Sequence, residues 1–188
     1  MNPPLLRVES PILVLPTANI DTDQIVPARF LTTTDRDGLA DAAFADWRSD
    51  PASPLADARA RGCSVLVAGD NFGCGSSREH AAWALRALGL RCVVSTSFAD
   101  IFRGNALKNG LLPIVVPEAF HRALVAAPWS ELHVDLERRV VTHAHGEIAF
   151  ALGDYERDCL MTGRDDLDQL LQRRAAITVF EARREAVR

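Results

Sequence analysis

The strongest constraint on the fold is the segment 69–80, GDNFGCGSSREH, because the residues around it predict a strand-loop-helix junction. The preceding residues 64–68 (SVLVA) are rich in β-branched side chains and predict a buried strand. The following residues 81–88 are mostly strong helix formers. Glycines within the junction permit positive φ and let a ligand approach the backbone closely. The segment is therefore a candidate ligand site.

The start of the predicted helix is a candidate anion site. Ser76 or Ser77 can cap the helix, with Glu79 three residues after Ser76 as in a capping box. The free N–H groups and positive dipole end of the helix attract anions, and Arg78 adds a guanidinium that suits a carboxylate or phosphate. The same charges would stabilise a deprotonated serine hydroxyl. The structural alternative, a glycine-rich turn followed by two capping serines, stays open at this point.

Two nucleotide-binding motifs are excluded at this loop. No Gly-Lys-Ser/Thr follows the glycines, and their spacing differs from that of a dinucleotide-binding fingerprint. A nucleotide-binding α/β domain is therefore disfavoured. That hypothesis predicts that NAD or ATP would stabilise the protein.

Length and charge narrow the class of protein. The 188 residues fit one domain, and 48% hydrophobic residues are enough for a core. The net charge of −4 argues against nucleic acid as a partner, because phosphate binding needs a basic face. Neither a signal-peptide pattern nor an apolar run approaching about 18 residues occurs. We expect a cytoplasmic protein that binds neither nucleic acid nor a membrane.

The cysteines argue against a metal centre built by this chain alone. None of Cys63, Cys74, Cys92 and Cys159 forms a C-x-x-C pair. Buried free thiols in a reducing compartment are favoured. Cys74 lies inside the candidate loop, and whether it reacts or packs stays open.

The remaining pattern predicts an α/β fold. Apolar runs predict further strands at 12–15, 91–95, 111–116, 132–136, 140–143 and 148–151. Helices are expected at 98–108, 117–126 and, as two or three pieces, 154–186. Two successive strand-helix-strand units imply a parallel core with right-handed crossovers, followed by an antiparallel hairpin. We expect residues 1–10 to be irregular and Ser97 to cap the helix that ends at Asn109-Gly110.

Two segments before the junction hold further candidates. Asp21 and Asp23 flank a threonine between apolar residues, which indicates an ordered loop. Each carboxylate could satisfy nearby backbone N–H groups, or an aspartate or Arg29 could point into a site. Residues 32–50 predict a polar loop followed by a short amphipathic helix. Because this region is the most loop-like part of the chain, a mobile lid would cost the least free energy to build there.

Taken together, these segments resemble the 3-isopropylmalate dehydratase small-subunit family of the aconitase superfamily. The resemblance is carried by the segment 69–80, by NIDTDQIVPA (19–28), by SFADIF (97–102) with KNGLLPI (108–114), and by residues 159–160 and 165–167. It spans essentially the whole chain in order. It implies one swivelling β/β/α domain over residues 1–188, with a possibly mobile substrate loop at about 31–50.

The resemblance also implies a partner and a reaction. The partner is a large subunit that carries a [4Fe–4S] cluster with one open iron site, in a heterodimer or heterotetramer. The reaction is the isomerisation of 2-isopropylmalate to 3-isopropylmalate through isopropylmaleate, in leucine biosynthesis. The absence of cluster-like cysteine spacing agrees with a cluster held by the partner.

The resemblance assigns roles in the junction. Ser76 is the implied base and later proton donor, because a serine alkoxide is strong enough to remove a proton from carbon beside a carboxylate. Ser77 and Arg78 would bind a substrate carboxylate or steady Ser76, and Gly75 would support the site. Glu79 is interpreted as a cap. His80 is interpreted as structural.

The same resemblance assigns roles before the junction. Arg29 is a candidate second carboxylate clamp, and Asp21 and Asp23 would orient the site without reacting. The isopropyl group must meet an apolar surface, for which Leu31 is the candidate, with Phe30 and Leu39 beside it. The composition of the loop after Phe30 leaves open a related 2-alkylmalate or homoaconitate hydro-lyase subunit. A non-catalytic dicarboxylate-binding module is the alternative from another class.

Overall fold

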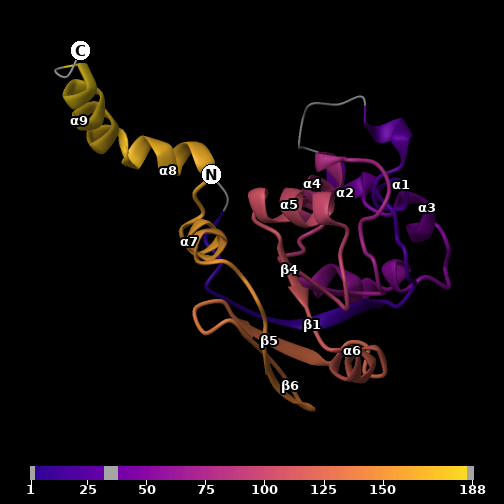
Figure 1. The fold of residues 1–188 in the computed structure, drawn as a ribbon. Coiled ribbons are helices and arrows are strands. Elements are labelled where there is room, and N and C mark those ends of the chain that lie inside the picture. The colour runs from indigo at the N-terminus through magenta and orange to yellow at the C-terminus, as the bar shows by residue number, and fades with distance from the viewer. Residues whose placement is uncertain (1–2, 32–37, 186–188) are drawn as a thin grey trace.

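The centre of the structure is one seven-stranded sheet with the strand order β4-β3-β2-β1-β5-β6-β7. The computed structural model describes residues 3–31 and 38–185, and Figure 1 shows their arrangement. The strands are β1 (Arg7–Leu15), β2 (Val65–Ala68), β3 (Cys92–Ser95), β4 (Leu112–Val115), β5 (Glu131–Asp135), β6 (Val140–His143) and β7 (Gly146–Ala149). Strand β1 divides the sheet into a parallel and an antiparallel half.

Strand β1 is longer than predicted. Its second half pairs parallel with β2, from Ile12 opposite Val65 onward, and its first half pairs antiparallel with β5, from Arg7 opposite Asp135. The expectation that residues 1–10 are irregular was therefore wrong for residues 7–10. Their polar composition gives little local signal, and a partner strand from much later in the chain supplies their hydrogen bonds.

The parallel half confirms the two predicted strand-helix-strand units. Helix α4 (Glu79–Ala87) joins β2 to β3, and α5 (Asp100–Lys108) joins β3 to β4. Alternate strand residues face opposite sides of the sheet. Leu66 and Ala68 accordingly belong to the core that α4 and α5 cover, whereas Val65 and Val67 belong to a second core with α6 (Glu118–Val125).

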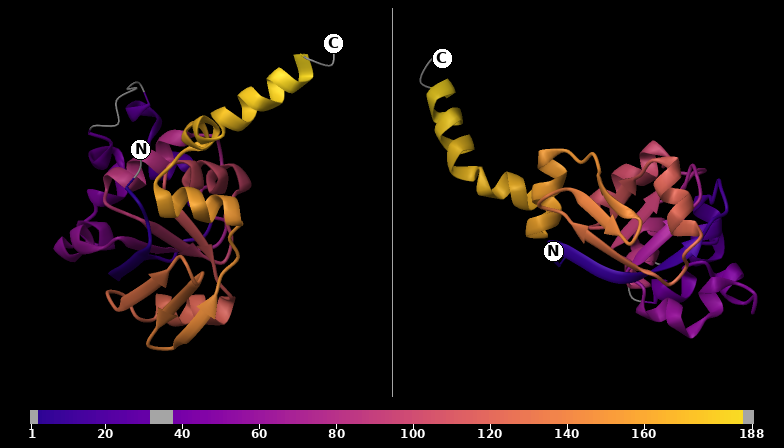
Figure 2. Two further views of the ribbon diagram at one scale, coloured as in Figure 1. Left: turned by 90° about the vertical axis from the view of Figure 1, so that its left-hand side faces the viewer. Right: turned by 90° about the horizontal axis from the view of Figure 1, so that it is seen from below.

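The antiparallel half is followed by three helices. Strands β5, β6 and β7 form an antiparallel meander, which confirms the predicted hairpin and the further predicted strand. Helix α7 (Asp154–Thr162) buries Leu160 in the second core. Helices α8 (Asp166–Gln172) and α9 (Arg174–Glu185) then project from the body, as Figure 2 shows. Among the described helices, none is both long and apolar enough to cross a membrane.

The segment between β1 and β2 contains only short helices. They are α1 (Thr22–Ile25), η1 (Ala28–Phe30), α2 (Leu39–Ala42), α3 (Ala45–Arg48), η2 (Pro54–Ala56) and η3 (Ala58–Gly62). The predicted mobile loop at about 31–50 lies partly outside the described residues, at 32–37. In its described remainder, the single expected helix is divided at Phe44, whose φ of 50° interrupts it. Leu39 and Phe44 are buried there in the first core.

Gly73 closes the junction against α5. Its φ is +77°, and a Cβ built on it would lie 2.2 Å from Cγ of Phe102. Both the backbone conformation and the close contact therefore require glycine at this position.

We expect Gly73→Ala to lower the free energy of unfolding by about 1–3 kcal/mol, through backbone strain and displacement of Phe102. Gly104→Ala is the matched control, because Gly104 lies inside α5 with nothing within 4 Å of an added Cβ. That control should raise the free energy of unfolding by up to about 1 kcal/mol. Urea denaturation measures both variants. Equal shifts of the same sign would contradict the assignment.

Candidate active site

The loop after β2 lies against the segment 19–23, which the sequence had marked separately. The backbone N–H of Asn19 donates to the carbonyl of Asp70 at 2.8 Å, and that of Gly73 donates to Ile20 at the same distance. The N–H of Thr22 donates to the carbonyl of Cys74 at 2.9 Å. Two segments far apart in the sequence thus satisfy each other's backbone groups.

Side chains reinforce this pairing. The Thr22 hydroxyl donates to the carbonyl of Ser76 at 2.9 Å, and the Asn71 amide donates to the Asn19 side chain at 2.8 Å. The half-buried Cys74 thiol donates to the Asn19 carbonyl at 3.4 Å. Gly75 adopts a φ of +90° where the loop crosses α1. The loop is therefore held on both sides up to Ser76.

Ser76 and Ser77 are exposed at the end of this loop. Within the part of the chain that the structure describes, neither hydroxyl makes a hydrogen bond. The Ser76 backbone is fixed by Thr22, so its side chain faces solvent from an anchored position. Both hydroxyls are open to a ligand.

The predicted serine cap is wrong. Helix α4 begins at Glu79, and the residue in the capping position is Arg78, with extended φ and ψ and no side-chain hydrogen bond to the helix. Both serines precede that position. Glu79 does not act as the predicted cap either, since its carboxylate accepts from the Asn109 amide at 2.9 Å. The first N–H groups of α4 therefore lack a side-chain cap and can bind an anion.

Arg78 is held beside the serines by an ion pair. Its guanidinium binds the carboxylate of Asp23, which lies in the first turn of α1. The Arg78 side chain is only 18% exposed, whereas that of Asp23 is 52% exposed. The ion pair therefore orients the mostly buried guanidinium of Arg78 at the end of the loop.

Asp21 has a local structural role. Its carboxylate accepts from the backbone N–H of Gln24 at 2.7 Å, and the Gln24 side chain accepts from the N–H of Asp21 at 2.9 Å. This is a capping box at the start of α1. Asp21 therefore stabilises the short helix that carries Thr22 and Asp23.

The structure places Arg29 in a different set of contacts. Its guanidinium donates to the Asp46 carboxylate at 2.5 and 3.3 Å and lies 4.8 Å from the centre of the Phe30 ring. Hydrogen bonding within this exposed pair raises the pKa of Arg29 and lowers the pKa of Asp46. Leu31 is half-buried against the first core, and Leu39 is buried within it. Neither Arg29 nor Leu31 has a described contact with the serines.

Asp70 and Ser97 form a tie that the sequence analysis missed. The Asp70 carboxylate accepts from the hydroxyls of Ser97 at 2.5 Å and Thr96 at 2.9 Å, which lowers the pKa of Asp70. Ser97 also accepts from the N–H of Asn71 and does not cap a helix, because α5 begins only at Asp100. Both residues follow parallel strands, whose carboxyl ends meet at one edge of the sheet. The sequence therefore contained the signal for this contact, because each of the two residues follows a predicted parallel strand.

A second tie joins α4 to α5 through the buried Asn109. Its side chain accepts from the Trp83 indole at 2.8 Å and donates to Glu79 and to the carbonyl of Asn105, both at 2.9 Å. The His80 ring lies 4.7 Å from that of Trp83. These contacts agree with a structural role for His80.

The described cysteines do not fit an iron–sulfur cluster. Cys63 and Cys92 are buried, and burial raises the pKa of both thiols, that of Cys92 to about 12. Among the described residues, no three His, Cys, Asp or Glu side chains form a group suited to a metal ion. The described part of this chain therefore offers no ligand set for such a cluster.

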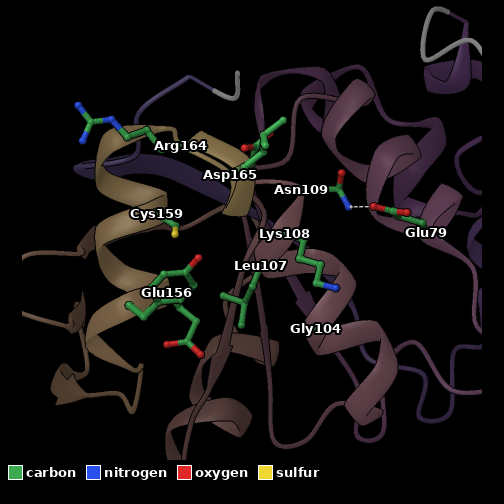
Figure 3. Close-up of a pocket in the computed structure, with 11 residues that line it drawn as sticks. Glu79, Gly104, Leu107, Lys108, Asn109, Glu156, Cys159, Arg164 and Asp165 are labelled. Carbon is green, nitrogen blue, oxygen red and sulfur yellow. Dashed lines mark hydrogen bonds between the residues drawn. The ribbon is translucent and has the colours of Figure 1, made fainter. Parts of the chain in front are cut away.

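A cavity of about 500 Å³ lies beside the first residue of α4 (Figure 3). It lies between α4 and α5 on one side and α7 and α8 on the other, and its wall includes Glu79, the residue after Arg78. Leu107, Tyr155 and Leu167 provide apolar surface. The cavity therefore connects the start of α4 with the C-terminal helices α7 and α8.

Comparison with known proteins now decides the family. The model of the aconitase C-terminal domain matches residues 4–119. The 3-isopropylmalate dehydratase small subunit of Anaeromyxobacter sp. (strain K) is 52% identical, covering 96% of this chain and 98% of that protein. The chain belongs to the 3-isopropylmalate dehydratase small-subunit family, within the aconitase C-terminal domain family.

Further members of the family agree. The 3-isopropylmalate dehydratase small subunit of Herpetosiphon aurantiacus is 47% identical, with 95% of this chain and 93% of that protein covered. A crystal structure of 3-isopropylmalate dehydratase from Methanocaldococcus jannaschii matches with a TM-score of 0.72 and 30% identity, over 92% of this chain and 98% of that chain. The family and the α/β fold class expected from the sequence are confirmed.

We expect Asp23→Asn to lower kcat/KM of the assembled enzyme about tenfold, because Arg78 loses its fixed orientation. Stability should change by less than about 1 kcal/mol, since the pair is partly exposed. Steady-state kinetics with the large subunit provides the test. Glu118→Gln, which breaks an exposed pair with Arg122 on α6, is the control. Equal kcat/KM values for the two variants would show that Asp23 does not position Arg78.

Proposed function

We propose that this chain supplies half of a hydro-lyase active site, with Ser76 as the base. Membership in the family makes the chain the small subunit of an enzyme that interconverts 2- and 3-isopropylmalate in leucine biosynthesis, together with a large subunit. One observation carries the assignment of Ser76. Its hydroxyl is exposed on an anchored loop, beside the uncapped start of α4 and the oriented guanidinium of Arg78.

The chemistry explains why these groups stand together. Removing a proton from carbon beside a carboxylate requires a strong base, and an alkoxide needs nearby positive charge to form. The alkoxide of Ser76 takes the proton from one carbon, a carbon–carbon double bond forms, and the neighbouring carbon loses its hydroxyl as hydroxide. A general acid of the large subunit would protonate that hydroxide to water. Ser76 then returns the proton to the other carbon when water adds in the opposite sense.

Substrate binding is the proposed role of the neighbouring side chains. Arg78 has five N–H donors, so a substrate carboxylate can bind donors that Asp23 does not occupy. Ser77 would donate a hydrogen bond to the same carboxylate. Arg29 would clamp the second carboxylate after leaving Asp46, and Leu31 would meet the alkyl group. Gly75 and Asp21 maintain the backbone that presents Ser76 and Asp23.

The cofactor and the assembly are further parts of the proposal. The large subunit would carry the [4Fe–4S] cluster, which supplies a Lewis acid for the departing hydroxyl. We propose a heterodimer or heterotetramer, a 2-alkylmalate as substrate, and one swivel-type domain over residues 1–188 with a mobile loop at about 31–50. None of the four described cysteines forms a disulfide, which supports a reducing compartment such as the cytoplasm.

We expect Ser76→Ala to lower kcat by at least about 10²–10⁴-fold, because the proton acceptor is lost. Isopropylmaleate formation, followed by its ultraviolet absorbance with the large subunit present, measures turnover. Size-exclusion chromatography should show unchanged assembly, because the Ser76 hydroxyl is exposed and makes no hydrogen bond to a described residue. Ser77→Ala is the matched control and should raise KM while retaining most of kcat.

The possible results separate the alternatives. Full turnover by Ser76→Ala would refute its role as base. Absence of turnover by the wild-type complex, together with calorimetric binding of dicarboxylates, would instead indicate the non-catalytic module. Faster turnover of another 2-alkylmalate would reassign the substrate.

A further inference from the structure

Helices α8 and α9 expose a set of large apolar side chains, and we call these two helices the arm. The side chains are between 41% and 65% exposed: Leu167, Leu170, Leu171, Ile177, Val179 and Phe180. Soluble monomers rarely leave such a concentration of apolar surface open to water, and where it occurs it usually marks an interaction site.

Gln169 joins the arm to α7 in the body of the protein. Gln169 of α8 donates to the carboxylate of Asp158 at 2.8 Å and approaches the Cys159 sulfur at 3.9 Å. Figures 1 and 2 show α9 pointing away from the sheet. Helices α8 and α9 contain 7 and 12 residues, lengths at which an isolated helix is only marginally stable in water. A partner surface would stabilise both.

The spacing of the apolar residues defines a contact face on each helix. Leu167, Leu170 and Leu171 follow the i, i+3, i+4 pattern on α8, and Ile177 and Phe180 are three apart on α9. This is the pattern of helices that pack an apolar stripe against another element. No described element of the chain covers the exposed side chains.

The arm is continuous with the proposed active site through the cavity of Figure 3. Leu167 belongs both to the arm and to the cavity wall, which also includes the half-exposed Tyr155 of α7. The opposite wall contains Glu79 and Asn109, at the start of α4 and the end of α5. The cavity lining therefore extends from Glu79, the residue after Arg78, to Leu167 at the start of the arm.

The composition of this surface is that of an interface. Its apolar side chains are bordered in the cavity by charges of both signs, Lys108 and Arg164 with Glu156 and Asp165. Protein interfaces commonly combine an apolar centre with a charged or polar rim.

We propose that the large subunit docks along this surface, filling the cavity and covering the apolar face of the arm. This inference rests on the proposed function, which requires the large subunit to complete the site at Ser76. A second copy of this chain would bury the same side chains but would not supply the part of the active site that this chain lacks. Of these two occupants, only the large subunit would both cover the apolar side chains and complete the active site.

The test compares assembly by Leu171→Gln/Phe180→Gln with assembly by Glu181→Gln. Glutamine retains good helix propensity, and Glu181→Gln introduces the same side chain on α9 without removing apolar surface. The large subunit encoded in the same genome is titrated into each variant, and activity and complex formation are followed. We expect the double variant to need at least about tenfold more large subunit for half-maximal assembly, with kcat unchanged at saturation.

Several results would overturn the docking surface. One is an equal titration midpoint for the double variant and Glu181→Gln. Another is a wild-type chain that sediments as a dimer, is made monomeric by the double variant, and assembles with the large subunit at an unchanged midpoint. In that case a second copy covers the arm. Circular dichroism verifies the helix content, and Phe180→Gln alone gives the same test if the double variant does not fold.

The inference and the proposed function fail in different ways. A Ser76→Ala variant that retains turnover refutes the base but leaves the titration result intact. An unchanged midpoint for the arm variants refutes the docking surface even if Ser76→Ala abolishes turnover.

Discussion

The pairing of the segment 19–23 with the loop after β2 is the interaction on which the site depends. Neither segment is part of a regular strand, so each exposes backbone groups that need partners. The hydrogen bonds from Asn19 to Asp70 and from Thr22 to Cys74 provide those partners. They also place Thr22 below Ser76 and Asp23 beside Arg78. The candidate base and its neighbouring charge are thus positioned by the same contact.

The strand that leads into this contact is held firmly, because side chains of β1 belong to both hydrophobic cores. Leu13 and Leu15 face the core covered by α4 and α5, whereas Ile12 and Val14 face the core covered by α6. The segment 19–23 follows β1 and the loop follows β2, and the two strands are parallel neighbours. Loops at the ends of such strands can carry exposed polar groups while the strands fix their position.

The sequence predicted the elements whose signals are local. The strand before Gly69, both crossover helices and the antiparallel meander are marked by apolar runs and by the residues that end them. The first half of β1 was missed because residues 7–10 become a strand only through pairing with β5. The division of the helix at Phe44 likewise depends on a backbone angle of one residue, which composition does not specify.

For the site, the sequence identified the residue types but not their partners. It marked Asp23 and Arg78 in separate segments, and only the folded chain brings them together as an ion pair. Arg29 was expected at the substrate, yet its nearest acceptor is Asp46, which the loop composition did not single out. The serine cap failed because the extended backbone of Arg78 moves the start of α4 past both serines.

That displaced helix start has a physical consequence. A side-chain cap would stabilise α4 by about 1 kcal/mol and would occupy the N–H groups that face the loop. Without it, those N–H groups stay available to an anion directly after Arg78. Asp23 binds Nη1 of Arg78, so the guanidinium keeps further N–H donors. A lysine would offer a similar charge without the planar set of donors that suits a carboxylate.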